Sequence, residues 1–284
     1  MSQTLHLELK NISFEKIKDE WTQIKYLSLQ ELEEVNERSK LGCDIVDYYF
    51  FEQRLKTKGN KGINFYDFVE NIEHYKTKKY IQNQIVYCDK HNRYLDNIYK
   101  RYYYIYGLSF GRVNAFKITN ALKIYKTYNP THILDPFCGF GGRCAAAMML
   151  DISYTGIDIN HDLAPCYKKL TADFDINPTL HFQDCLSVDY SKINYDMVFT
   201  SPPYENIEVY PNNPTMTNKE WTAFYNKIFK LLWDNLKHGH FIININEKIY
   251  NKILVPLFGE CHTKLLLNKS KRNAYVEYIY VWVI

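Results

Sequence analysis

The sequence lacks the features of a membrane protein and of a disulfide-stabilised secreted protein. It contains no run of 18 apolar residues, and its first ten residues (MSQTLHLELK) show no signal-peptide pattern. The seven cysteines are odd in number and show no paired spacing, which favours reduced thiols. With 284 residues, 46% of them hydrophobic, the chain can build one large domain or one domain and a small one. We therefore expect an intracellular protein with no membrane partner.

Glycine is scarce, with 11 in the chain, but three of these fall within residues 139–142. Residues 131–134 (THIL) predict a short strand, 135–142 (DPFCGFGG) a glycine turn, and 143–150 a helix of small residues. Such a layout brings backbone N–H groups close to a ligand. Asp158 ends the next predicted strand, where an acid usually accepts from ribose hydroxyls. No Walker lysine follows the glycines, which argues against a triphosphate.

A second motif, Ser201-Pro202-Pro203-Tyr204, follows the apolar run 195–200 (YDMVFT), which predicts a buried strand. The motif therefore falls at the carboxyl edge of a sheet, where open α/β sheets bind their ligands. Because proline has no N–H, this rigid loop accepts hydrogen bonds and does not donate them at residues 202 and 203. An accepting loop beside an aromatic ring suits a planar amine, such as the exocyclic NH2 of a nucleobase.

The pattern of elements predicts an α/β fold with a helical extension. From about residue 108, strands are expected at 132–135, 154–158, 180–184, 196–201, 240–246, 260–267 and 276–283. Helices separate the first five strands, the clearest being 219–236, and a polar hairpin at 268–273 joins the last two. Residues 1–107 read as mainly helical, with helices at 64–80 and 92–106 and a capping box at Ser28 and Glu31. We divide the chain into an extension, 1–107, and a catalytic domain, 108–284.

The two motifs together resemble those of the amino-methyltransferases, which methylate exocyclic amines of nucleobases with S-adenosylmethionine. The family's cofactor motif is DPFxGxG and its catalytic motif is (D/N/S)PP(Y/F), matched here by DPFCGFGG and by SPPY. The SPPY form is typical of DNA cytosine-N4 enzymes, whereas DPPY and NPPY are commoner in adenine-N6 enzymes. The wider phrases FGRVNAF and FTSPPYENIEVY look most like phage- and virus-type DNA modification methylases. The resemblance covers roughly residues 109–284.

The resemblance implies a class I methyltransferase fold, which is Rossmann-like, with a mostly parallel seven-stranded sheet and an antiparallel last strand. It implies S-adenosylmethionine as cofactor, Asp158 as the ribose acid, Asp184 as the acceptor from the adenine amine, and Arg112 as the partner of the cofactor carboxylate. The full set of implied cofactor-binding residues is Arg112, Asp135, Pro136, Phe137, Cys138, Gly139, Gly141, Asp158, Asp184 and Cys185. No metal is expected.

The implied chemistry is direct methyl transfer to a flipped base. An exocyclic amine is a poor nucleophile because its lone pair is delocalised into the ring. Ser201 Oγ and the Pro202 carbonyl are the candidate acceptors that would restore the lone pair, and Tyr204 would stack on the base. The catalytic residues are therefore expected to be Ser201, Pro202, Pro203 and Tyr204.

Basic charge is concentrated before the catalytic motifs. Residues 54–126 contain 15 Lys and Arg against 5 Asp and Glu, whereas 127–284 contain 14 against 16. Tyrosines are interleaved with the cations at 94–106, a combination that suits phosphate contact and base stacking. We expect this segment to bind DNA, the extension to recognise the target, and a homodimer to be a possible means of reading a palindrome.

The main hypothesis is a site-specific DNA methyltransferase, with cytosine N4 ahead of adenine N6, as in restriction-modification. An RNA methyltransferase of the guanine-N2 type remains an alternative because DPFCG-type loops also occur there. A protein-glutamine methyltransferase and a non-catalytic subunit that binds cofactor and nucleic acid are further alternatives. The expected location is the cytoplasm, or the nucleus or a viral factory in a eukaryotic host.

Overall fold

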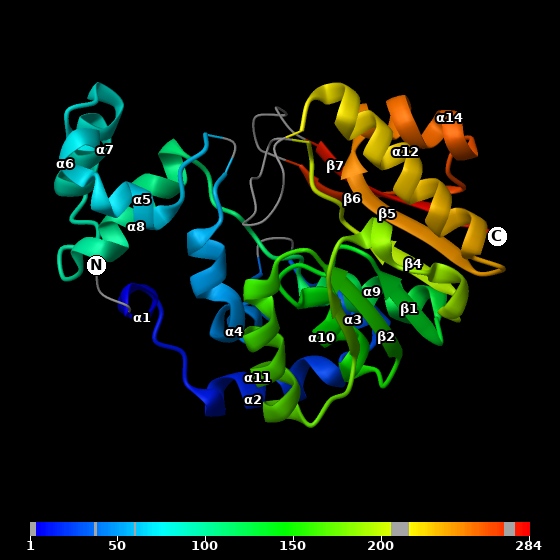
Figure 1. Ribbon diagram of the computed structural model, residues 1–284. Helices are drawn as coiled ribbons and strands as arrows, with labels where there is room; N and C mark the ends of the chain where they lie inside the picture. The colour runs from blue at the N-terminus through cyan, green and yellow to red at the C-terminus, as the bar shows by residue number, and fades with distance from the viewer. Residues whose placement is uncertain (1–3, 37–38, 60, 206–215, 270–275) are drawn as a thin grey trace.

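The computed structural model describes residues 1–284 except 1–3, 37–38, 60, 206–215 and 270–275, and it is built around a seven-stranded sheet (Figure 1). The strands are β1 (His132–Asp135), β2 (Ser153–Asp158), β3 (Thr179–Phe182), β4 (Met197–Thr200), β5 (His240–Asn246), β6 (Thr263–Lys269) and β7 (Val276–Val283). Their order is β3-β2-β1-β4-β5-β7-β6, with β7 antiparallel to both neighbours and the other pairs parallel. The expected class I methyltransferase fold is confirmed.

Alternate residues of the central strands enter two different cores, as the period of two in a strand requires. Ile133, Phe199 and Ile242 face one core, in which α9 (Ile118–Tyr128), α10 (Gly142–Met149) and α11 (Ala164–Phe174) pack. Leu134 and Val198 face the other, which is covered by α12 (Asn218–Asn235), α13 (Glu247–Ile249), the π-helical turn Tyr250–Leu254 and α14 (Val255–Phe258). Figure 1 shows α12 and α14 together on this side. The sheet is thus buried on both faces.

The amino-terminal region supplies eight more helices among the described residues. They are α1 (Leu5–Leu9), α2 (Phe14–Lys25), α3 (Leu29–Glu34), α4 (Cys43–Lys56), α5 (Phe65–Glu70), α6 (Ile72–Lys76), α7 (Lys79–Lys90) and α8 (Ile98–Ser109). Helices α5–α8, which we call the outer lobe, lie apart from the sheet in Figure 1. They enclose a third core, formed with α1 and one side of α4.

Residue 107 does not mark a break between two cores. Trp21 of α2, Leu32 of α3 and Phe50 of α4 belong to the same core as α9, α10 and the sheet. Helix α4 is apolar on two sides because Phe50 faces this core while Phe51 faces that of the outer lobe. The extension is helical as expected, but its first half is part of the catalytic unit.

Several expected boundaries differ in the structure. The helix expected at 64–80 is divided at Asn71 between α5 and α6, and α8 begins at Ile98, after turns in which Asn92 and Tyr94 have positive φ. Strand β3 ends at Phe182 because Asp184 caps the turn that follows. The capping box at Ser28 is confirmed. Residues 270–273 of the expected hairpin lie outside the described residues.

Among the described residues, no helix combines the length and apolar character needed to cross a bilayer.

Candidate active site

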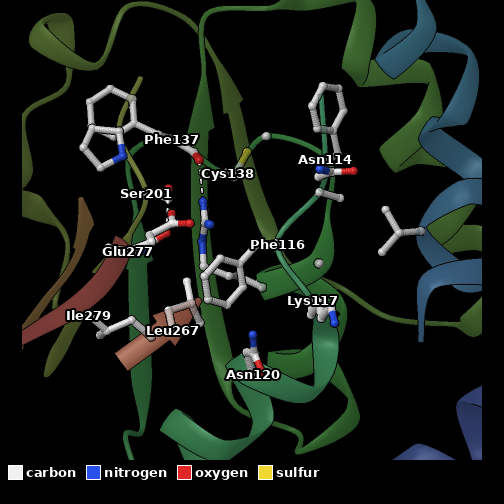
Figure 2. Close-up of a pocket in the computed structure, with 18 of the residues that line it drawn as sticks. Asn114, Phe116, Lys117, Asn120, Phe137, Cys138, Ser201, Leu267, Glu277 and Ile279 are labelled. Atoms are coloured by element: carbon white, nitrogen blue, oxygen red, sulfur yellow. Dashed lines mark hydrogen bonds between the residues drawn. The ribbon is translucent and has the colours of Figure 1, made fainter. Parts of the chain in front are cut away.

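A cavity of about 1360 Å³ opens at the carboxyl edge of the parallel strands, where α/β folds bind ligands. Figure 2 shows Phe116 within it, Ser201 and Glu277 on one side, and Asn114 and Lys117 on the other. The lining includes residues 114–117, 136–140, 158–159, 184–186 and 201–204, together with Trp221, Phe224, Asn244 and Glu277. The structure therefore brings the two predicted motifs into one cavity.

The glycine turn is shaped by close approaches from two other segments. A Cβ on Gly141 would lie 2.6 Å from Cε2 of Phe50, and Gly141 has φ +76°. A Cβ on Gly142 would collide with the backbone carbonyl of Phe116. Glycine is required at both positions, at Gly141 also because its left-handed backbone strains other residues. Gly141 itself supports the turn and does not line the cavity, whereas Gly139 and Gly142 do.

Asp135 lies below the turn, outside the cavity lining. Its fully buried carboxylate accepts from Arg143 Nε at 2.7 Å, from the Tyr154 hydroxyl at 2.7 Å and from Thr200 Oγ1 at 2.6 Å. Arg143 in turn donates to the Phe137 carbonyl at 2.6 Å. With both oxygens occupied, Asp135 fixes the turn rather than facing the cavity, so the structure does not bring it together with the other predicted cofactor residues.

Asp158 stands at the end of β2 with one oxygen on each of two backbone amides. It accepts from Gly139 N at 2.8 Å and from Asn160 N at 2.9 Å, which links it to the glycine turn. Burial raises the pKa of this carboxyl to about 6, although the two amide hydrogen bonds lower it. A carboxylate held in this way can accept from a ribose hydroxyl, as expected for this position.

The remaining predicted cofactor residues occupy the same part of the cavity. Pro136, Phe137 and Cys138 line it from the turn. Exposed Asp184 lines it too, with Oδ1 accepting from Leu186 N at 2.9 Å. Cys185 lies beside it, and burial raises the pKa of the Cys138 and Cys185 thiols, which suits apolar contact rather than nucleophilic chemistry.

Arg112 lies at the cavity lining but is held by α8. Its guanidinium stacks over the Tyr103 ring at 4.0 Å, and Nη2 donates to the Tyr103 carbonyl at 3.1 Å. Its proposed contact with the cofactor carboxylate stays a prediction.

The Ser201–Tyr204 loop is held by β5, β7 and α12. Ser201 Oγ donates to Asn244 Oδ1 at 3.1 Å, and the Tyr204 hydroxyl donates to Glu277 Oε1 at 2.6 Å. The Pro203 carbonyl accepts from the Tyr225 hydroxyl at 2.5 Å. No hydrogen bond among the described residues uses the Pro202 carbonyl. Ser201 and Pro202 therefore keep accepting atoms at the cavity, while Tyr204 and Pro203 fix the loop.

Sequence reasoning missed several lining residues on other elements. Asn244 interrupts the apolar strand HFIININ, and Glu277 is the one acid in β7 (VEYIYVWV), so both stood out as polar positions in buried strands. Phe116, Trp221 and Phe224 gave no such signal because aromatic residues are common throughout the chain.

The amino-terminal region also reaches this cavity. Arg54 of α4 donates through Nε to the Val113 carbonyl at 3.1 Å, forms an ion pair with buried Asp47, and contacts Asn114 Oδ1 at 3.4 Å. Lys10 pairs with the same Asp47. Helix α4 thus positions the 113–117 segment that forms one wall. The described residues contain no group of three or more His, Cys, Asp or Glu that could hold a metal ion.

Residues 130–231 match a family model described as RNA cap guanine-N2 methyltransferase. The matched range contains the glycine turn, Asp158, Asp184 and the Ser201–Tyr204 loop. Together with the strand order, the match identifies this part of the chain as an S-adenosylmethionine-dependent methyltransferase. The expected enzyme class and cofactor are confirmed in this coarser form, whereas the match gives no support to a DNA substrate. A comparison with curated proteins finds no match.

Solved structures of similar shape are methyltransferases among others, all at low identity. They include magnesium protoporphyrin IX methyltransferase from Synechocystis PCC 6803 with bound SAM (14% identity, 58% of this chain and 75% of that chain, TM-score 0.40). TehB from Haemophilus influenzae matches at 13% identity over 63% of this chain and 65% of that chain, with a TM-score of 0.43. An RNA methyltransferase from Salinibacter ruber, in complex with S-adenosyl-L-homocysteine, matches at 13% identity over 61% and 94%, with a TM-score of 0.41. With TM-scores below 0.5, we draw no conclusion from these matches.

Proposed function

We propose that this methyltransferase acts on the exocyclic N2 amine of guanine in capped RNA. The observation that carries the proposal is the family match over residues 130–231, which contains every predicted site residue except Arg112. This substrate replaces the cytosine of DNA that the SPPY motif alone favoured, and it keeps the chemistry of an exocyclic amine.

The cofactor side of the cavity fits S-adenosylmethionine, which supplies an electrophilic methyl group when bound. Asp158 would accept from the ribose hydroxyls and exposed Asp184 from the adenine amine. Phe137 and Cys138 would provide apolar contact from the glycine turn. The fit rests on this donor-and-acceptor set and on the two positions of the turn where only glycine is tolerated.

On the substrate side, Ser201 Oγ and the Pro202 carbonyl accept from the amine and draw its lone pair out of the ring. Trp221 and Phe224 give the cavity aromatic walls for a flat base. Because no covalent intermediate with the protein is needed, alignment supplies most of the acceleration, and orientation effects of this kind are worth about 7–11 kcal/mol.

The outer lobe is the proposed contact for the nucleic-acid chain. Lys61, Lys78, Lys79, Lys90 and Arg93 are exposed, and none forms an ion pair among the described residues. Arg93 also lies over the rings of Tyr87 and Tyr104, at 5.5 and 5.2 Å from their centroids. Cations interleaved with aromatic rings suit phosphates and unstacked bases.

DNA methylation at cytosine N4 is the second candidate, favoured by Ser201 at the head of the motif, with adenine N6 behind it. Rates of label transfer from S-adenosylmethionine to a capped RNA, the same RNA without a cap, a tRNA and a duplex DNA separate the candidates. The proposal predicts the highest kcat/KM for the capped RNA. Equal rates on capped and uncapped RNA would contradict the cap, and transfer to DNA alone would establish the second candidate.

A further inference from the structure

We propose that Glu277 selects guanine by accepting the hydrogen on ring nitrogen N1, beside the N2 amine that Ser201 and Pro202 receive. This inference rests on the proposed function and assigns a specificity role to a residue outside both sequence motifs. Glu277 lies on β7, opposite Asn246 of β5, and its side chain reaches the cavity next to the Ser201–Tyr204 loop. Figure 2 shows Ser201 and Glu277 on the same side of the cavity.

The hydroxyl protons of this loop are directed away from the substrate. Tyr204 has one proton, and its shortest hydrogen bond, 2.6 Å, is to Glu277 Oε1. Asn244 is 1% exposed, and its Nδ2 donates to the Tyr278 carbonyl at 3.0 Å, so its Oδ1 faces Ser201. Ser201 Oγ then donates its proton to that oxygen. The lone pairs of Ser201 Oγ are left as acceptors.

Glu277 adds a second acceptor to this edge. Its Oε1 is taken by Tyr204, while no hydrogen bond or ion pair of the described residues uses Oε2. A carboxylate is an acceptor only. Ser201 Oγ, the Pro202 carbonyl and Glu277 Oε2 therefore form one accepting edge, which leaves any ring acceptor that faces it without a partner.

Guanine is the base that complements such an edge. Its N2 amine and the adjacent N1–H present three hydrogens in a row. In cytosine and adenine the amine is adjacent to an unprotonated ring nitrogen, N3 or N1, whose lone pair would face the Glu277 carboxylate. An unpaired acceptor in a buried site is costly, and so is the approach of two lone pairs.

The test compares two capped RNAs that differ at the cap base, guanine in one and 2-aminopurine in the other. Both bases carry the amine at C2, but N1 of 2-aminopurine has no hydrogen. The variants are Glu277→Gln, which keeps an oxygen for the Tyr204 hydroxyl and gains an N–H2 donor, and Glu205→Gln as matched control. Glu205 pairs with Lys248 and lies outside the cavity lining.

For wild type and for Glu205→Gln, kcat/KM should favour guanine by at least about tenfold. Glu277→Gln should shrink this preference to about threefold or less and raise the rate on 2-aminopurine, since its amide can donate to N1. Equal losses on both RNAs, or an unchanged preference, would overturn the inference while leaving N2 methylation of guanine intact. Wild-type product at cytosine N4 or adenine N6 would overturn the proposed function, and this inference with it.

Discussion

The ring of Phe50 occupies the space in which a side chain at Gly141 would lie, with Cε2 only 2.6 Å from the position of a Cβ. Phe50 belongs to α4 and Gly141 to the cofactor turn, so a helix from the first fifth of the chain sets the shape of a turn more than 80 residues away. The same ring packs edge-on against Tyr167 at 4.9 Å, and the Tyr167 hydroxyl donates to the Gly139 carbonyl. The amino-terminal region is therefore part of the cofactor site.

Gly141→Ala should weaken S-adenosylmethionine binding by about tenfold or more, because both the left-handed backbone and the Phe50 ring oppose a methyl group. Gly111→Ala is the matched control, since Gly111 has φ +81° but nothing within 4 Å of its Cβ position. Calorimetric titration with the cofactor measures both variants. Adding Phe50→Ala to Gly141→Ala should recover part of the affinity, and equal losses in the two glycine variants would argue against the Phe50 contact.

Asp135→Asn should lower the free energy of unfolding by about 3–5 kcal/mol, because it leaves the Arg143 guanidinium buried with reduced charge compensation. Urea denaturation of the apoprotein measures the change. Asp234→Asn, which removes an exposed pair with Lys230, should cost no more than about 0.5 kcal/mol. A stable Asp135→Asn protein that has lost only cofactor affinity would instead favour direct contact between Asp135 and the cofactor.

Cofactor affinity should depend on pH through Asp158, whose pKa of about 6 is raised chiefly by burial. Ribose hydroxyls donate to the ionised form, so affinity should be constant above pH 6 and fall toward tenfold per unit below it. The sign for folding is opposite: the folded pKa lies above the model value of 3.8, so this group's stabilisation is present at low pH and is lost as pH rises through about 4–6. Titrations from pH 5 to 8 test the first statement, and a flat profile would remove Asp158 from the binding site.

Asn244→Ala should lower kcat by about 10- to 100-fold with little change in cofactor affinity, because Ser201 loses the acceptor that directs its proton away from the substrate. Asn246→Ala is the control on the same strand. Asn246 caps α13 by accepting from Ile249 N at 2.9 Å, so its loss should cost about 1 kcal/mol of stability and leave kcat unchanged. Single-turnover rates and cofactor titrations together separate the two effects.

The sequence was most informative where local pattern and chemistry coincide. The strand ends at Asp135, Asp158 and Thr200 were predictable because apolar runs stop there at glycine, proline or acid residues. The role of Asp135 was not, since its partners Arg143, Tyr154 and Thr200 meet only in the folded protein. Glu277 was missed because its position depends on the register of β7 against β5.

The division at residue 107 failed for a related reason. A helix that is apolar on two sides, as α4 is, reads simply as a buried helix, and the sequence does not say which two cores it joins. Deleting residues 1–90 would remove α2 and α4 from the core of the catalytic unit, so point variants of the exposed cations Lys78, Lys79, Lys90 and Arg93 are the sharper test of nucleic-acid binding.

The central claim is that the product is a guanine methylated at N2 in RNA. The most direct measurement is transfer of a labelled methyl group from S-adenosylmethionine to a mixture of total RNA and unmethylated genomic DNA, followed by mass spectrometry of the nucleosides. The account predicts label in guanosine from RNA, methylated at N2, and its absence with Ser201→Ala. Label in N4-methylcytosine or N6-methyladenine from DNA, with none in RNA, would contradict it.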